Sequence, residues 1–189
     1  MISAYSVYGM QVLRRAEGFW EQLESPTGTY DLLRFSALMG LFPFAGYLFN
    51  YTIVGRIWST WPYINTTLTV QRGLMCAALQ WVFFVTFPIL SSITLHRFFR
   101  RWNVVGDPND WTLTLTYSMT PVYLAALFVG IPFAGRMLAV LGMSTFLYLV
   151  YFAMRLYLKQ SVVRSAVITT AVLVMFGFLR QIFVYVIGF

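Results

Sequence analysis

The sequence predicts an all-α membrane protein, a bundle of five transmembrane helices preceded by one amphipathic interfacial helix. Three observations support this class. Only 10% of the residues are charged and 59% are hydrophobic, whereas a soluble domain is roughly 25% charged. The chain contains apolar runs close to the ~20 residues that cross the ~30 Å hydrocarbon core as a helix. Two of these runs, 112–131 and 137–157, follow one another across a short Gly/Pro turn, which no soluble fold requires.

The apolar runs set the bounds of the expected crossings. We expect spanning helices over residues 32–54, 73–95, 112–131, 137–157 and 166–189. Each of the first three contains an internal proline, namely Pro43, Pro88 and Pro121. A proline is tolerated inside a membrane helix when neighbouring groups satisfy the carbonyl that it leaves unbonded. Kinked and closely packed helices are therefore expected.

The N-terminal segment has a different pattern. Residues 8–24 predict an amphipathic helix whose apolar positions recur at helical spacing: Val12, Ala16, Phe19 and Leu23. This helix is too charged to span a membrane and fits one that lies on the interface; packing on the protein's own loops is the alternative. We therefore divide the chain into a cytoplasmic or interfacial segment, residues 1–31, and one transmembrane domain, residues 32–189. No cleavable signal peptide is expected, because no long apolar stretch precedes the first span.

The distribution of basic residues predicts the orientation. Nine flank the side of the N-terminus and three the other side: Arg14, Arg15, Arg34, Arg97, Arg100, Arg101, Arg155, Lys159 and Arg164, against Arg56, Arg72 and Arg136. The positive-inside rule then places the N-terminus in the cytoplasm and the C-terminus outside. The net charge of +7 indicates anionic lipid headgroups on the cytoplasmic face as partners, rather than nucleic acid.

Two stripes of small or hydroxylated residues suggest how the helices pack. Ala126, Gly130 and Ala134 are spaced by four, a pattern that allows close helix contact within one chain, in a homo-oligomer or with a membrane-protein partner. A second stripe has the same spacing: Thr112, Thr116 and Thr120. These hydroxyls either bond across helices, line a polar cleft, or bond the carbonyls of their own helix.

Arg180, beside Gln181, is the most unusual residue, because it lies near the middle of the last predicted span. An arginine there costs about 2.5 kcal/mol or more, and no acidic residue occurs in any predicted span. Its side chain either extends toward the headgroups or forms, with Gln181, a site for an anion, a lipid phosphate or a partner's carboxylate. Both alternatives stay open at this point.

Two polar segments border the second and third runs. Residues 96–102 form a basic patch, with Arg97, Arg100 and Arg101, that either binds anionic lipid or a cytoplasmic partner or serves as a stop signal. Residues 106–110 predict a turn and a helix N-cap at Asp110 or Asn109. We expect no metal site and no cofactor, since neither segment contains enough ligands at a suitable spacing.

Several segments resemble the Yip1-domain family, in particular its small bacterial inner-membrane members. Residues 116–121, TYSMTP, followed by VYLAALFVGIPFAG, resemble the family's segment opening the third helix, with Tyr117 and Pro121 as its aromatic and proline positions. The Tyr-rich LYLVYFAMRLYL and the proline-containing GLFPFAGYLF resemble the family's fourth and first helices. The resemblance implies a five-helix protein of the bacterial inner membrane. The Asp-Leu-Tyr-Gly-Pro stretch of eukaryotic members is absent, so their role in vesicle traffic is not implied.

These observations lead to two functional hypotheses. The first is a non-catalytic integral membrane protein that acts by lateral packing with lipid, with itself or with a protein partner. The second is a small transporter or channel component whose polar path runs past the threonine stripe and Gln80 toward Arg180. An enzyme is not expected, because the sequence has no phosphate-binding loop, no paired intramembrane carboxylates and no histidine beside a nucleophile.

Overall fold

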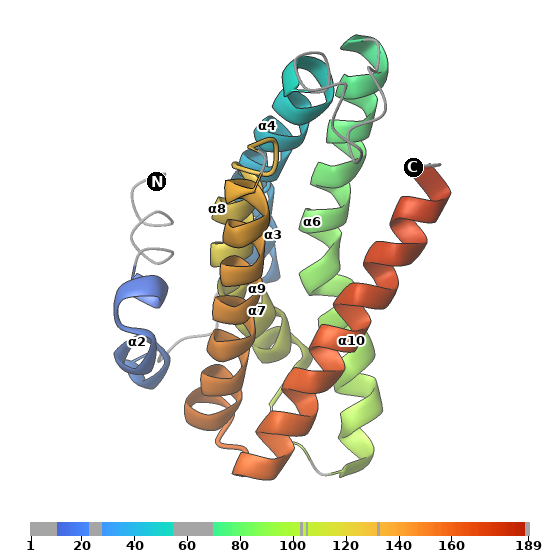
Figure 1. Cartoon of the computed structure of the whole chain (residues 1–189). Coiled ribbons are helices and arrows are strands. Elements are labelled where there is room, and N and C mark those ends of the chain that lie inside the picture. The colour runs from blue at the N-terminus through green and yellow to red at the C-terminus, as the bar shows by residue number, and fades with distance from the viewer. Residues whose placement is uncertain are drawn as a thin grey trace.

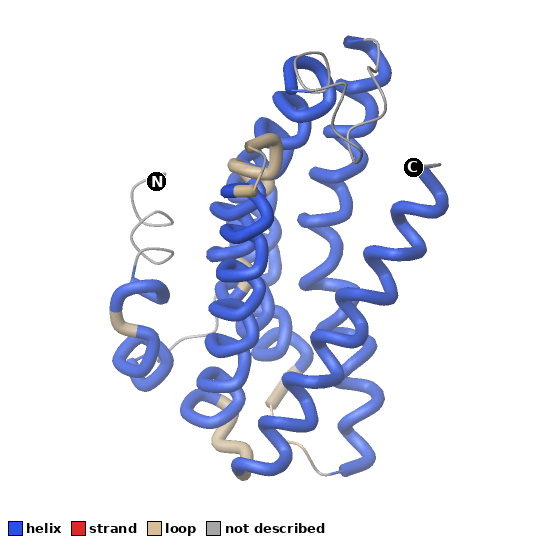
Figure 2. The backbone as a smooth tube through the Cα atoms, viewed as in Figure 1, coloured by secondary structure: helices blue, strands red, loops and turns tan. Residues whose placement is uncertain are grey.

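The computed structural model describes residues 11–22, 28–54, 70–102, 104, 106–131 and 133–187. Within these residues the regular structure is helical and no strand occurs (Figure 2). Four helical segments are long and apolar enough to cross a membrane: Tyr30–Ile53, Val70–Trp102, Ala134–Tyr157 and Val162–Phe183. They correspond to the first, second, fourth and fifth predicted runs, which is compatible with an integral membrane protein.

The bounds of the helices are α2 Ala16–Gln22, α3 Thr29–Met39, α4 Leu41–Phe49, η1 Asn50–Val54, α6 Val70–Phe99, η2 Arg100–Trp102, α7 Pro108–Ser118, α8 Thr120–Ala126, α9 Ala134–Phe152, η3 Ala153–Tyr157 and α10 Val162–Ile187. The segments α3–α4, α6, α7–α8, α9 and α10 alternate in direction along the bundle (Figure 1). The turn between α8 and α9 lies at one end of the bundle, whereas the end of α6 and the start of α10 lie at the other (Figure 1).

The third predicted run is not one helix, which corrects the expected span over 112–131. It is divided at Met119 into α7 and α8, of 11 and 7 residues; at 1.5 Å per residue the longer one reaches only about 16 Å. The break occurs because Pro121 has no N–H to bond the Tyr117 carbonyl. Instead, the Thr120 hydroxyl donates to that carbonyl at 2.7 Å. Residues 111–126 are buried apart from Leu124, which is half-buried, so this broken helix forms the centre of the bundle.

A second proline is accommodated by the neighbouring helix. Pro88, inside α6, leaves the Phe84 carbonyl without its usual helical donor. The Tyr123 hydroxyl of α8 donates to this carbonyl at 3.0 Å. Close to Pro43 and to the break between α3 and α4, the Trp81 indole of α6 donates to the Ala37 carbonyl of α3 at 3.0 Å. Side-chain hydrogen bonds to backbone carbonyls thus connect the proline-containing helices, as expected for closely packed membrane helices.

The outer helices cover this central element. The α7–α8 pair contacts α3, α4, α6 and α9, and α10 packs against α6 and α9. Phe176 of α10 meets Phe87 of α6 edge to face, with ring centroids 4.9 Å apart. Other apolar side chains of α10 are exposed, with Val174 at 65% and Phe178 at 64%. A large apolar surface is therefore available to lipid or to another protein.

The N-terminal helix packs on the bundle, not on the interface alone. Val12, Phe19 and Trp20 are buried in a cluster with side chains of α3, α7 and α9. Phe19 and Tyr117 lie edge to face, with ring centroids 5.6 Å apart. The apolar face of this helix is therefore occupied by the protein's own helices, because aromatic side chains of the bundle cover it. Its position at the membrane interface stays a prediction. Residues 8–10 and 23–24 of the predicted helix lie outside the described residues.

The small residues that allow close helix contact are not those of the predicted stripe. Ala126 ends α8, Gly130 lies in the turn that follows, and Ala134 begins α9, so the three do not share one helix face. The stripe fails because the helix ends before its second member. Instead, Gly46 of α4 faces the backbone at Ala126 and Leu127, where a Cβ would lie 2.8 Å from the Leu127 Cα. Gly142 of α9 faces α8 in the same manner.

Candidate functional site

The side chain of Arg180 is held inside the bundle by hydrogen bonds to two other helices. Its Nη1 donates to Gln80 Oε1 of α6 at 2.6 Å, and its Nη2 donates to the Tyr47 hydroxyl of α4 at 3.2 Å. Gln80 Nε2 in turn donates to the Tyr51 hydroxyl at 3.5 Å. We call these four residues, Arg180, Gln80, Tyr47 and Tyr51, the Arg180 cluster. The guanidinium thus points to helix side chains rather than toward lipid headgroups.

Local sequence explains how each helix presents its member of the cluster. Tyr47 and Tyr51 are four residues apart, so they project from the same side of the α4–η1 segment. Gln80 is only 2% exposed. It lies one helical turn from buried Cys76, on the side of α6 that faces the bundle. Burial of its amide requires hydrogen-bonding partners, and Arg180 and Tyr51 supply them.

The cluster reduces the cost of placing a cation at membrane depth. On insertion scales an arginine costs about 2.5–3.5 kcal/mol at the centre of a spanning helix. This is an upper bound for Arg180, because it lies three residues from the end of the candidate span Val162–Phe183. A hydrogen bond to a charged group contributes about 1.5–3 kcal/mol, and Arg180 makes such bonds to Gln80 and to Tyr47. Its guanidinium carbon also lies 5.7 Å from the ring centroids of Tyr47 and Phe83, within cation–π range. These contacts with an amide, a hydroxyl and two aromatic rings offset part of the cost of burying the cation. None of the contacting groups carries a negative charge.

A cavity of about 130 Å³ adjoins the guanidinium. It lies where α4, α6, α8, α9 and α10 meet, and the described residues that line it are Tyr47, Phe84, Val122, Ala125, Ala126, Val129, Ala139, Met143, Phe176 and Arg180. Polar groups reach it from Arg180 and Tyr47, and the remaining lining side chains are apolar. The cavity therefore combines one cationic end with hydrophobic walls.

Other residues of the predicted site lie apart from this cavity. Gln181 is exposed and does not join Arg180. The Thr112 hydroxyl donates to the Pro108 carbonyl of its own helix at 2.9 Å. It also forms a 2.7 Å hydrogen bond with the Ser92 hydroxyl of α6. Thr116 is buried without a hydrogen-bond partner among the described residues. None of the threonines of the stripe is among the described residues lining the cavity, so the expected path from them to Arg180 is not continuous here.

The basic patch lies at the end of α6 that is distant from the cluster. Arg97, Arg100 and Arg101 are all exposed. The neighbouring turn begins α7 with Asp107 as the N-cap, which corrects the expected cap at Asp110 or Asn109. Asp110 instead accepts from the Asp107 N–H at 3.0 Å and from the Tyr157 hydroxyl at 2.8 Å. Within the part of the chain that is described, no group of three or more His, Cys, Asp or Glu side chains lies close enough to hold a metal ion.

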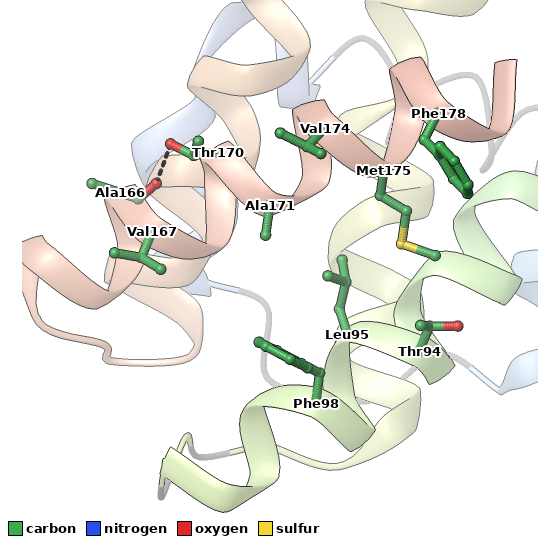
Figure 3. A pocket seen from close by; sticks show the side chains of 10 residues that line it. All are labelled: Thr94, Leu95, Phe98, Ala166, Val167, Thr170, Ala171, Val174, Met175 and Phe178. Carbon is green, nitrogen blue, oxygen red and sulfur yellow. Dashed lines mark hydrogen bonds between the residues drawn. The ribbon is translucent and has the colours of Figure 1, made fainter. Parts of the chain in front are cut away.

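A larger apolar groove, of about 650 Å³, separates α6 from α10 (Figure 3). Its walls are Thr94, Leu95 and Phe98 of α6 and Ala166, Val167, Thr170, Ala171, Val174, Met175 and Phe178 of α10. Its hydroxyl-bearing side chains are already bonded to their own helices, Thr94 to the Leu90 carbonyl at 2.8 Å and Thr170 to the Ala166 carbonyl at 2.9 Å. The groove therefore presents an almost purely hydrophobic surface.

Two residues of the Arg180 cluster, Tyr47 and Tyr51, were not predicted from the sequence. The available signal was their spacing of four within an apolar run, which places two hydroxyls on one helix side. Comparison with protein-family models, with curated proteins and with solved structures found no match to the chain. The fold and the two cavities are therefore the observations from which function is inferred.

Proposed function

We propose that this chain is a non-catalytic, Yip1-like integral membrane protein of the bacterial inner membrane that acts by lateral packing with lipid. The single observation that carries this proposal is the apolar groove between α6 and α10 (Figure 3). In the proposed arrangement the chain crosses the membrane five times, with α7 and α8 together as the third crossing. The N-terminus is cytoplasmic, and the ends of α6 and α9 lie at the cytoplasmic surface.

The size of the groove supports an acyl chain as its occupant. Along α10 its lining extends from Ala166 to Phe178, about 18 Å at 1.5 Å per residue. This is close to half of the ~30 Å hydrocarbon core, which is the depth of one leaflet. Its open side would face the bilayer, so a lipid could enter laterally.

Charge at the cytoplasmic end supports an anionic lipid. Arg101 lies three residues after Phe98, in η2, which continues α6. Arg164 lies three residues before Val167 on α10, so both arginines lie near the same end of the groove walls. Both side chains are exposed. A basic residue near the surface contributes roughly 1 kcal/mol toward anionic headgroups. The groove and these arginines together fit a phospholipid with one acyl chain between the helices and a negative headgroup above them.

Lipid retention tests this proposal. The full chain is purified in mild detergent, and bound phospholipids are measured by native mass spectrometry after exchange into micelles with equal amounts of phosphatidylglycerol and phosphatidylethanolamine. We expect preferential retention of phosphatidylglycerol. Ala166→Phe, which fills the groove, abolishes retention, and Arg101→Ala with Arg164→Ala removes the preference. Val163→Phe, on an exposed position outside the groove lining, is the matched control. Equal retention in all variants would overturn the proposal.

A small transporter or channel component is the second candidate. It is favoured by the cavity beside Arg180, which places a cation next to an internal space. Reconstitution into proteoliposomes tests it, with anion flux measured for the native chain and for Arg180→Met. Flux that depends on Arg180 supports transport. Flux no greater than that of empty liposomes removes this candidate and leaves lateral packing unaffected.

A further inference from the structure

We infer that the cavity beside Arg180 is a binding site for one small monovalent anion. The site goes beyond lateral packing with lipid. It shares its location with the transport candidate, but it requires only binding and no movement across the membrane. The inference rests on the charge of the Arg180 cluster, on the hydrogen-bond donors that the cluster leaves free, and on the size and lining of the cavity.

Among the described residues, no acidic side chain is paired with Arg180. Its hydrogen-bond partners in the described part of the chain, Gln80 and Tyr47, are neutral. The sequence has six acidic residues, and none lies within a candidate span apart from Asp31, at the opposite end of α3–α4 from Tyr47: Glu17, Glu21, Glu24, Asp31, Asp107 and Asp110. A cation without a counter-charge is costly in an apolar surrounding. An anion supplied from solution would neutralise it.

Hydrogen-bond donors remain for such an anion. A guanidinium has five N–H donors, of which the bonds to Gln80 and Tyr47 use one from each terminal nitrogen. The Tyr47 hydroxyl accepts from Arg180, and its own proton has no acceptor among the described residues. Gln80 holds its oxygen toward Arg180 and its nitrogen toward Tyr51. Arg180 and Tyr47 are thus the proposed ligands, and Gln80 positions the guanidinium.

The cavity also limits which anions fit. Its volume of about 130 Å³ corresponds to roughly four water molecules at 30 Å³ each, which is too small for a whole phospholipid. Its walls at Phe84, Val122 and Phe176 offer no donors to replace lost water. A strongly hydrated or divalent anion would therefore pay a desolvation cost that a single guanidinium does not offset. Iodide, thiocyanate and bromide are expected to bind more tightly than chloride, and sulfate is expected not to bind.

Direct binding of iodide tests the inference. The purified full chain in a neutral detergent is incubated with radiolabelled iodide at constant ionic strength, with gluconate as the balancing anion. We expect saturable binding of one ion per chain, displaced by thiocyanate and bromide and not by sulfate. Arg180→Met weakens binding by at least about tenfold, as loss of a charged hydrogen bond predicts. Arg136→Met, a basic residue outside the cavity lining, leaves it unchanged.

Two further variants keep the test decisive if Arg180→Met fails to fold. Arg180→Lys retains the charge, and we expect it to keep weakened binding. Tyr47→Phe removes a ligand hydroxyl without changing the charge, and we expect a several-fold loss of affinity. Non-saturable binding, or binding unaffected by Tyr47→Phe and Arg180→Lys, would overturn the inference. Saturable binding without flux in proteoliposomes supports the site and removes the transport candidate. If the native chain binds no iodide but retains lipid normally, the anion site alone is overturned.

Discussion

Arg180 donates a 2.6 Å hydrogen bond to Gln80, a residue 100 positions earlier in the chain, and this bond joins α10 to α6. Gln80, whose amide oxygen accepts this bond, is only 2% exposed. Each partner therefore satisfies a group that would be costly to leave alone inside the bundle. The same pair joins the two helices that form the apolar groove, and Arg180 also lines the cavity proposed for an anion.

Replacing Gln80 is expected to destabilise the protein more than replacing Arg180. Gln80→Leu leaves the guanidinium with Tyr47 as its remaining hydrogen-bond partner among the described residues. The substitution should lower the free energy of unfolding by about 3 kcal/mol, the upper end for a hydrogen bond to a charged group. Arg180→Met strands only a neutral amide and should cost about 1–3 kcal/mol. The double variant should be more stable than Gln80→Leu alone. Unfolding titrations in mixed micelles measure these values, and equal effects of both single variants would contradict the assignment.

The Tyr123 hydroxyl is expected to matter only because Pro88 is present. Tyr123→Phe leaves the buried Phe84 carbonyl without a donor, which should cost about 1–3 kcal/mol. In a Pro88→Ala background the restored N–H can bond that carbonyl, so the same substitution should be nearly neutral. A double-mutant cycle measured by thermal unfolding tests the coupling. Strictly additive effects would argue against this pairing.

Gly46 is expected to tolerate no side chain. A Cβ there would lie 2.8 Å from both the Cα and the carbonyl oxygen of Leu127, and backbone atoms cannot rotate away. Gly46→Ala should therefore destabilise the protein by about 1–3 kcal/mol through overpacking. Gly177→Ala is the control, because nothing lies within 4 Å of its Cβ position. Its thermal midpoint should equal or exceed that of the native chain, since alanine is the better helix former.

The proposed orientation predicts opposite accessibility for two exposed positions, Arg136 and Ser161. In a background carrying Cys76→Ala, Arg136→Cys should react with a membrane-impermeant maleimide in intact bacteria. Ser161→Cys should react only after the cells are opened. Gel-shift labelling measures both. The reverse pattern would show that the bundle is inserted with its N-terminus outside.

Some features of this protein follow from local sequence alone. The low fraction of charged residues and the long apolar runs determine a helical membrane protein, because each run must satisfy its backbone within its own helix. Four of the five runs form helices long enough to span, close to their expected bounds. The prolines at 88 and 121 likewise predict that a carbonyl needs another donor. These are properties of neighbouring residues, and hydropathy and spacing are sufficient to recognise them.

The remaining features depended on how distant helices pack. The donor that reaches the Phe84 carbonyl, the inward packing of Trp20 and the partners of Arg180 were not predictable from spacing. In each case the outcome depends on groups far away in the chain: Tyr123 reaches Phe84, and Gln80 with Tyr47 reaches Arg180. Apolar periodicity determines that a helix buries one side, but not which helix covers it. That choice depends on side-chain shape and hydrogen-bond satisfaction summed over the whole bundle.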